Sequence, residues 1–490
     1  MKRYIAALDQ STSSSKAFLL DEAGEIIARA ALPHRLYYPA DGYVEQDAEE
    51  IYRNVVSVLA QVLTGHAAAE IAAIALCNQR ETTVFWDRAT GKPLRPTVVW
   101  QDSRAEALTL RLQAHADEVR SVTGLVLSPY YPAAKIAAVF ENDTELARRV
   151  HAGEACVGTV DSYLVYRLTG GRVFQTDASN ASRTQLASLK DGAWAESLCQ
   201  LFGVPVSALP IIAASDASYG ETHCEGLPEG VAITGVMGDS HAALFGQGCT
   251  TAGQAKATFG TGSSIMMNTG NMPAQADGTL SVCVGYAFGG KTCYALEGNI
   301  THCGDTLCWL RDELGLLRDV SEAEALAATV KSEKGLYLIP AFSGLGAPYF
   351  EGAARAMICG MSRGTTKAHL ARAALESIAY QDADVLEVME RLTEQPLSQL
   401  MVDGTPTRNA ALMQFLADLL GRPVQCAAAS ELSALGAGYM AGITTGVYRD
   451  LESIPARQKP AARYTPDPAF AAKEALAGWR SAVRRCLPQA

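Results

Sequence analysis

Residues 4–21 read YIAALDQSTSSSKAFLLD, two apolar runs joined by a turn that is rich in hydroxyl groups. Such runs predict two β-strands, and a third apolar run follows the Gly24 turn at residues 26–30. This strand–turn–strand unit differs from a P-loop, in which a glycine-rich loop opens directly into a helix. The amides and hydroxyls of the turn are suited to wrap phosphate oxygens, while Asp9 is suited to hold a hydrated Mg²⁺ ion.

A similar unit recurs in the second half of the chain. An apolar run at residues 231–238 ends at Asp239 and leads into a short helix. Residues 254–265 then read as a strand, a Gly-Thr-Gly turn and the start of another strand. A third element, residues 401–405, runs from a strand into a glycine turn and precedes a helix over 409–420. The two halves therefore form a weak internal repeat.

Length, charge and cysteine usage limit the domain number, the binding partners and the cellular compartment that we expect. The chain has 490 residues, too many for one core, so we expect two domains, 1–246 and 247–490, with the active site in the cleft between them. The net charge of −11 argues against nucleic-acid or membrane-surface partners, because both are anionic. The 12 cysteines form no CxxC pair, and no stretch approaches the roughly 18 apolar residues that span a bilayer. We therefore expect a cytoplasmic protein.

Several motifs together resemble one known family. Residues 77–83 read CNQRETT and residues 344–349 read GLGAPY. Further matching runs lie at residues 42–47, 99–101, 180–184, 356–376 and 375–381. Spread over essentially the whole chain, these runs resemble the glycerol kinase branch of the FGGY carbohydrate kinases. The resemblance implies an α/β fold of two actin/hexokinase-like (ribonuclease H-like) domains and ATP-dependent phosphorylation of a primary hydroxyl of a small polyol or sugar.

The resemblance also implies roles for individual residues. Asp239 is the expected general base, which takes the proton of the attacking hydroxyl. The substrate would be held by Arg80 and Glu81, with Trp100 packing on its carbons and Tyr130 donating its hydroxyl. The residues expected to contact Mg-ATP are Thr12, Ser13, Ser14, Lys16 and Thr261 at the phosphates, Gly304, Cys308, Thr405 and Asn409 around the nucleotide, and Asp9 at the metal. Without the resemblance, an Asp after Gly238 is also typical of a helix cap.

The sequence departs from the family at the substrate site. Ser240 stands where glycerol kinases carry a Gln that touches the substrate, and Ser264 stands where they carry a Phe that packs on glycerol. Both changes shorten a side chain, so we expect a larger, more polar pocket and a substrate with more carbons and hydroxyls than glycerol. Ordered water filling the space is the alternative explanation.

Departures also occur around the nucleotide. Ser11 and Thr405 each replace a Gly, and Cys308 replaces a Gln. Residues 221–229 are acidic and carry no Arg or Lys, so the family's allosteric site for a sugar bisphosphate is not expected. A side chain at Ser11 or Thr405 must fit its turn, which bears on the affinity for ATP.

Two alternatives remain open. A ketopentose kinase of the xylulokinase type is one, although such kinases usually carry Met-His where Arg80 and Glu81 stand. A non-catalytic ATP-binding switch is the other, because the same fold also hosts actin and chaperones. Asp239 and the Arg80–Glu81 pair favour the kinase, since a switch would not need them. The expected partners are a small polyol or ketose and further copies of the chain in a dimer or tetramer.

Overall fold

The computed structural model describes residues 3–273, 277–331, 335–454 and 460–488. Its first sheet has the order β13-β5-β1-β2-β3. The strands are β1 (Tyr4–Gln10), β2 (Ser14–Leu20), β3 (Ile26–Pro33), β5 (Ile71–Asn78) and β13 (Ile233–Gly238). β1, β2 and β3 pair antiparallel, whereas β5 and β13 add parallel to β1. The predicted strands within residues 4–21, 26–30 and 231–238 correspond to β1, β2, β3 and β13 of this sheet.

The second sheet repeats this plan, with the order β16-β17-β15-β14-β20-β21-β22. Its strands are β14 (Gln254–Phe259), β15 (Ser263–Gly270), β16 (Ser281–Phe288), β17 (Lys291–Ile300), β20 (Gln399–Gly404), β21 (Val424–Cys426) and β22 (Ala462–Tyr464). β14 pairs antiparallel with β15 and parallel with β20, as β1 does with β2 and β5. The internal repeat predicted from the sequence is confirmed.

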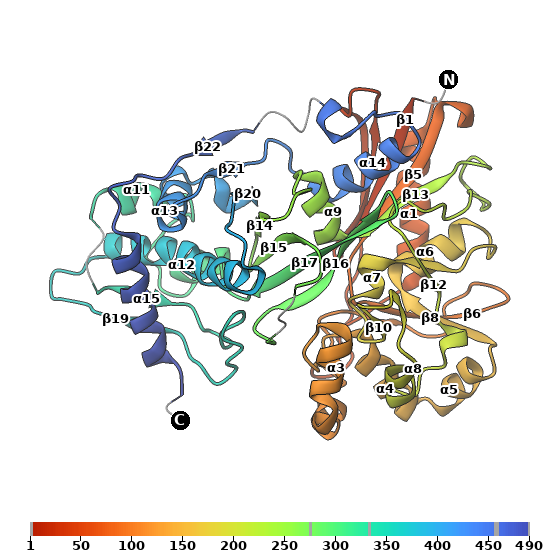
Figure 1. Ribbon diagram of the computed structural model, residues 1–490, viewed down its shortest axis with the longest axis horizontal. Helices are drawn as coiled ribbons and strands as arrows, with labels where there is room; N and C mark the ends of the chain where they lie inside the picture. The colour runs from red at the N-terminus through yellow and green to blue at the C-terminus, as the bar shows by residue number, and fades with distance from the viewer. Residues whose placement is uncertain (1–2, 274–276, 332–334, 455–459, 489–490) are drawn as a thin grey trace.

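Helices cover both sheets, and Figure 1 shows the two halves side by side. α1 (Ala48–Leu63) packs on β2 and β3, and Asp47 caps it by accepting from the Glu49 amide. α12 (Lys367–Thr393) lies in the core of the second half with α13 (Ala410–Leu420) and α10 (Gly304–Asp312). α9 (Asp239–Gly246) begins where β13 ends.

One helix from late in the chain joins the first half. α14 (Leu432–Thr444) packs on β5, β1 and β13, beside β1 in Figure 1. It approaches α9 so closely that a Cβ on Gly436 would lie 1.8 Å from the Ala242 carbonyl oxygen, which only glycine avoids. The boundary at residue 246 stays a prediction, and α14 shows that a later segment supports the first sheet.

The remaining elements lie mostly on the first half. The remaining strands of the first half are β4 (Glu45–Gln46), β6 (Thr83–Asp87), β7 (Thr97–Val98), β8 (Ala155–Thr159), β9 (Gln175–Asp177), β10 (Ala187–Ser188), β11 (Ala193–Trp194) and β12 (Ile211–Ala213). Its further helices include α4 (Pro132–Asn142), α5 (Thr144–His151), α6 (Val160–Leu168), α7 (Ala178–Ala181) and α8 (Glu196–Leu201). The second half adds α11 (Glu322–Ala328), β18 (Tyr337–Ile339), β19 (Met357–Cys359) and α15 (Ala472–Cys486). In the described ranges, no helix has the length and apolar character needed to cross a membrane.

The apolar periodicity of residues 103–122 predicts a helical stretch, and the structure is helical there but divides the stretch into three pieces. The structure has α2 (Glu106–Arg111), a 3₁₀ turn (Gln113–His115) and α3 (Ala116–Thr123). Leu112 leaves the helical region with φ −91° and ψ 8°, which ends α2.

Candidate functional site

The turn between β1 and β2 holds its shape through its own hydroxyls. The amide and the hydroxyl of Ser11 both donate to the Ser14 carbonyl oxygen, at 2.8 and 3.0 Å. Ser11 does not take up a left-handed φ, so the side chain at this position fits the turn. Ser13 and Thr12 lie at the tip, where Ser13 is exposed and Thr12 is half-buried. The hydroxyls predicted to bind phosphate therefore lie at one end of the first sheet.

Asp9 sits at the base of this turn, opposite Lys16 in the β1–β2 ladder. The pKa of Asp9 is raised to about 6, mainly because the carboxyl is buried; the charge of Lys16 lowers it and the charge of Asp239 raises it. The Cys77 thiol donates to Asp9 Oδ1 at 3.6 Å. Because the nearby Asp239 disfavours the charged form of Asp9, a divalent cation would neutralise this arrangement, so Asp9 fits Mg²⁺.

Asp239 is the first residue of α9, and the cap position before it belongs to Gly238. Its side chain is about one-third exposed, and its Oδ1 accepts from the Ser240 amide at 2.6 Å. Arg80 Nε lies 3.2 Å from the same oxygen. A Cβ on Gly238 would lie 2.8 Å from the Arg80 side chain, so glycine permits this approach. Asp239 is thus an accessible carboxylate held by a buried arginine.

Arg80 and Glu81 contact different partners. Arg80 donates from both terminal nitrogens to Glu297, at 2.7 and 3.1 Å, and Glu81 accepts from Arg183 Nε at 2.7 Å. Glu81 takes up a left-handed φ of 61°, unusual for a residue with a side chain. Arg183 Nη1 also lies 2.7 Å from Glu297. The arrangement differs from a simple Arg80–Glu81 pair, because each is held by a residue distant in sequence.

Sequence reasoning did not assign roles to Arg183 and Glu297. Arg183 lies in the run at 180–184, which was used only as a motif match. Glu297 follows the apolar residues 293–296 within strand β17, and its side chain is fully buried. A charge within an apolar strand signals a buried ion pair, since Glu is almost never buried unpaired.

Trp100 and Tyr130 lie together beside the hydroxyl-rich turn between β1 and β2. Their rings meet edge to face with centroids 5.7 Å apart. Trp100 Nε1 donates to Thr12 Oγ1 at 2.9 Å, which joins this aromatic wall to the turn. Burial raises the pKa of Tyr130 well above its ordinary value, so its hydroxyl stays protonated and able to donate.

A buried lysine contacts the backbone of both aromatic residues. Lys135, on α4, donates its ammonium to the backbone carbonyls of Trp100, at 3.1 Å, and of Tyr130. Burial lowers the pKa of Lys135 to about 7, although Glu81 and Asp102 favour its charged form. Sequence reasoning missed Lys135, because helix periodicity places it among core residues without indicating what it contacts.

Lys135→Met is expected to raise the acceptor KM roughly tenfold, since hydrogen bonds to a charged group contribute about 1.5–3 kcal/mol. Because Lys135 is charged below its pKa and neutral above it, the wild-type acceptor KM should also rise as pH increases through about 7. Steady-state kinetics between pH 6 and 8 measure both effects. Lys473→Met, on the exposed surface of α15, is the control. A pH profile of acceptor KM that is identical in Lys135→Met and wild type would contradict this role.

Ser240 and Ser264 lie on opposite halves of the chain. Ser240 is the second residue of α9, and Ser264 lies on β15 opposite Asn299 of β17, whose side chain is exposed. Lys256 donates to the Ser264 hydroxyl at 3.4 Å and to Thr258 at 3.1 Å. The neighbourhood of Ser264 is therefore polar, and the larger substrate pocket stays a prediction.

A cavity of about 680 Å³ in the second half of the chain collects the predicted nucleotide residues. Thr261, Gly304, Cys308, Thr405 and Asn409 all line it, together with apolar side chains such as Leu375 and Leu412. Its mixture of apolar walls and a few polar groups is typical of a site for a small organic molecule.

The turns around this cavity explain how it tolerates Thr405. Gly404 takes the left-handed φ of 98°, and Thr405 begins a 3₁₀ helix that extends to Arg408. The side chain of Asn409 caps α13 by accepting from the Leu412 amide at 2.9 Å. The β-branched residue therefore does not occupy the strained position of the turn.

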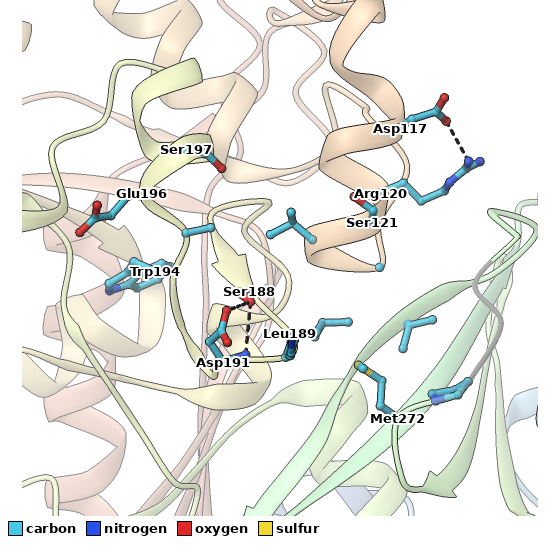
Figure 2. A pocket seen from close by; sticks show the side chains of 16 residues that line it. Asp117, Arg120, Ser121, Ser188, Leu189, Asp191, Trp194, Glu196, Ser197 and Met272 are labelled. Carbon is cyan, nitrogen blue, oxygen red and sulfur yellow. Dashed lines mark hydrogen bonds and ion pairs between the residues drawn. The ribbon is translucent and has the colours of Figure 1, made fainter.

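A different cavity of about 790 Å³ lies between the two halves (Figure 2). Asp117 and Arg120 of α3 pair at one edge, Ser188 and Asp191 hydrogen-bond on the floor, and Met272 comes from the second half. Within the described part of the chain, none of the site residues predicted from the sequence lines it.

Comparisons with known proteins agree over nearly the whole chain. Residues 4–246 match the N-terminal domain of the FGGY family of carbohydrate kinases, and residues 255–445 match its C-terminal domain. Glycerol kinase 1 of Thermotoga maritima is 42% identical over 491 residues, covering 99% of this chain and 100% of that protein.

Two solved structures superpose on the fold. A glycerol kinase of Plasmodium falciparum with ADP is 32% identical with a TM-score of 0.94, covering 99% of each chain. A xylulose kinase of Rhodospirillum rubrum is 27% identical with a TM-score of 0.88, covering 99% of this chain and 98% of that one. With both family domains present, the chain belongs to the FGGY family of carbohydrate kinases.

Proposed function

We propose that this protein transfers the terminal phosphoryl group of ATP to a primary hydroxyl of a small polyol or sugar, with Asp239 as the general base. One observation carries the proposal: Asp239 is an accessible carboxylate at a helix N-terminus, held by Arg80 and close enough to Asp9 to affect its ionisation. A base and a metal-binding carboxylate so arranged suit in-line transfer between an acceptor hydroxyl and a phosphate.

The acceptor would lie among groups that differ in chemistry. Arg80 and Tyr130 would donate to hydroxyls, Glu81 would accept from them, and Trp100 would cover the carbon chain. Asp239 would take the proton of the attacking oxygen as the bond to phosphorus forms. Arg80 and Glu81 are buried; Arg80 is paired with Glu297 and Glu81 with Arg183. Both side chains are therefore held in place before the substrate binds.

ATP would be bound from both halves of the chain. The phosphates would contact Thr12, Ser13, Ser14, Lys16 and Thr261, and the nucleoside would fill the cavity lined by Gly304, Cys308, Thr405 and Asn409. Mg²⁺ held by Asp9 would neutralise the charge of the phosphates. Below its pKa of about 6, Asp9 is protonated and less able to hold the ion.

We propose an acceptor with more hydroxyls than glycerol. This proposal is supported by the polar residues around Ser264: Asn299 is exposed, and Lys256 donates to the Ser264 hydroxyl. The glycerol kinase relatives favour a polyol, whereas the likeness to a xylulose kinase keeps a ketopentose as the second candidate. We also infer a cytoplasmic dimer or tetramer, which cell fractionation and light scattering would test.

ADP release across a panel of polyols and ketoses tests this function. The kinase predicts turnover that depends on the acceptor and on Mg²⁺. The absence of acceptor-stimulated turnover anywhere in the panel, with ATP still bound, would instead indicate an ATP-binding switch.

Ser240→Gln combined with Ser264→Phe is expected to shift preference toward glycerol, because the longer side chains refill the pocket. A ratio of kcat/KM values for glycerol and the preferred longer acceptor should change by roughly 10-fold or more, the effect of one or two methylene-sized contacts. Competition assays with both acceptors measure the ratio. If the unaltered protein already prefers glycerol to every longer acceptor, the interpretation of the two serines is wrong.

A further inference from the structure

Five charged side chains form a continuous series of ion contacts across the site; four of them are buried, and Asp239, at one end, is about one-third exposed. In order they are Asp239, Arg80, Glu297, Arg183 and Glu81. Neighbours lie 2.7–3.2 Å apart, and both carboxylate oxygens of Glu297 are in contact with arginine. The side chains of Glu297, Arg183 and Glu81 are at most 2% exposed. Acids and bases alternate, so each buried charge faces an opposite one.

Glu297 is the member of this chain that comes from the second sheet. It projects from β17, whereas Arg80 follows β5, Arg183 follows α7 and Asp239 begins α9, all in the first half. Burial works against the charged form of Glu297, but Arg183 and Arg80 hold its pKa below the usual range. The carboxylate is therefore compensated by arginines that belong to the other half of the molecule.

From this geometry we propose that Glu297 is a positioning residue, which completes the acceptor site only when the two halves are packed together. Separating the halves would leave Glu297 unpaired and release two nitrogens of Arg80. A buried charge without its partner is strongly disfavoured, so the ion chain favours the closed arrangement. Packing of the two halves against each other in turn fixes the Arg80 guanidinium that contacts Asp239. The same closure would exclude water from the site of phosphoryl transfer.

Glu297 acts through Arg80 rather than on substrate. Two terminal nitrogens of Arg80 each donate one bond to Glu297, and Nε faces Asp239, so the plane of the guanidinium is fixed. Arg183 links the same carboxylate to Glu81, whose backbone is in the left-handed region. One carboxylate thus sets the orientation of both groups expected to bind acceptor hydroxyls. The inference rests on the proposed function.

Glu297→Gln and Glu297→Asp test this role in the full-length protein. Glu297→Gln keeps the size of the side chain and removes its charge, whereas Glu297→Asp keeps the charge on a side chain that is one methylene shorter. We expect Glu297→Gln to raise the acceptor KM at least tenfold and to lower kcat, while ATP affinity, measured by calorimetry, changes less than twofold. Glu297→Asp should give an intermediate acceptor KM. Glu141→Gln, in an exposed ion pair with Arg111, is the matched control.

The outcomes separate a positioning role from a structural one. Equal losses of affinity for acceptor and ATP, or an unchanged acceptor KM and kcat in both variants, would overturn the proposal. If Glu297→Gln does not fold, the acceptor KM of Glu297→Asp decides alone. No turnover of the unaltered protein with any acceptor would refute the proposed function itself, whereas turnover unaffected by Glu297→Gln would refute only this inference.

Discussion

Asp239→Asn is expected to lower kcat by roughly three orders of magnitude, within the range that a general base contributes. The amide keeps the size of the side chain and can still face Ser240, but it cannot take the proton of the acceptor hydroxyl. The cavity proposed to bind the nucleotide lies in the second half of the chain and is not lined by Asp239, so ATP binding should change little. Single-turnover kinetics separate the chemical step from binding.

The control for this variant removes a carboxylate elsewhere. Asp312→Asn lies on the surface, in a pair with Arg311, and should retain the full rate. A near-normal rate in Asp239→Asn would remove Asp239 from the role of base. A large loss of ATP affinity in the same variant would instead assign it to nucleotide binding.

Gly304→Ala is expected to raise the KM for ATP by at least about tenfold, equivalent to about 1.4 kcal/mol. A Cβ on Gly304 would lie 2.6 Å from the Gly260 carbonyl oxygen, and both atoms belong to backbone that frames the nucleotide cavity. The Gly304 amide also donates to that oxygen at 3.1 Å. The added methyl group must push the Gly260–Thr261 turn away from α10.

Gly352→Ala is the matched control, since a Cβ at Gly352 would meet no atom within 4 Å. Titration of ATP at saturating acceptor gives the KM, and thermal unfolding reports whether Gly304→Ala remains folded. An unchanged KM for ATP in folded Gly304→Ala would show that this approach of Gly304 to the turn does not shape the site.

Much of the fold could be predicted from local sequence. The hydroxyl-rich turn after the first apolar run, and the Gly-Thr-Gly turn after a later one, indicated the repeated unit that both sheets share. The apolar spacing of the residues near 48–63 predicts a helix, and α1 occupies Ala48–Leu63. Residues 103–122 are helical, as their apolar spacing predicts, but that spacing does not reveal that the backbone leaves the helical region at Leu112.

Site residues that belong to a sequence motif could be predicted, whereas contacts between segments that are distant in sequence could not. Five predicted nucleotide residues line one cavity, and Asp239 contacts Arg80 as a shared site requires. The partner of Arg80 is Glu297, separated from it by 217 positions, and nothing local in either segment indicates the pair. Such long-range ion pairs depend on how the two sheets pack, which periodicity and turn chemistry do not specify.

The chain is a carbohydrate kinase of the FGGY family, an enzyme that transfers phosphoryl groups to an alcohol acceptor. The central claim is that Asp239 directs this transfer to a hydroxyl of a polyol or sugar. Phosphorus-31 spectroscopy of a reaction with Mg-ATP and the best acceptor tests it most directly. We predict equal amounts of ADP and a phosphomonoester in the wild type and neither in Asp239→Asn. Formation of ADP and free inorganic phosphate, without a phosphomonoester, would contradict the account.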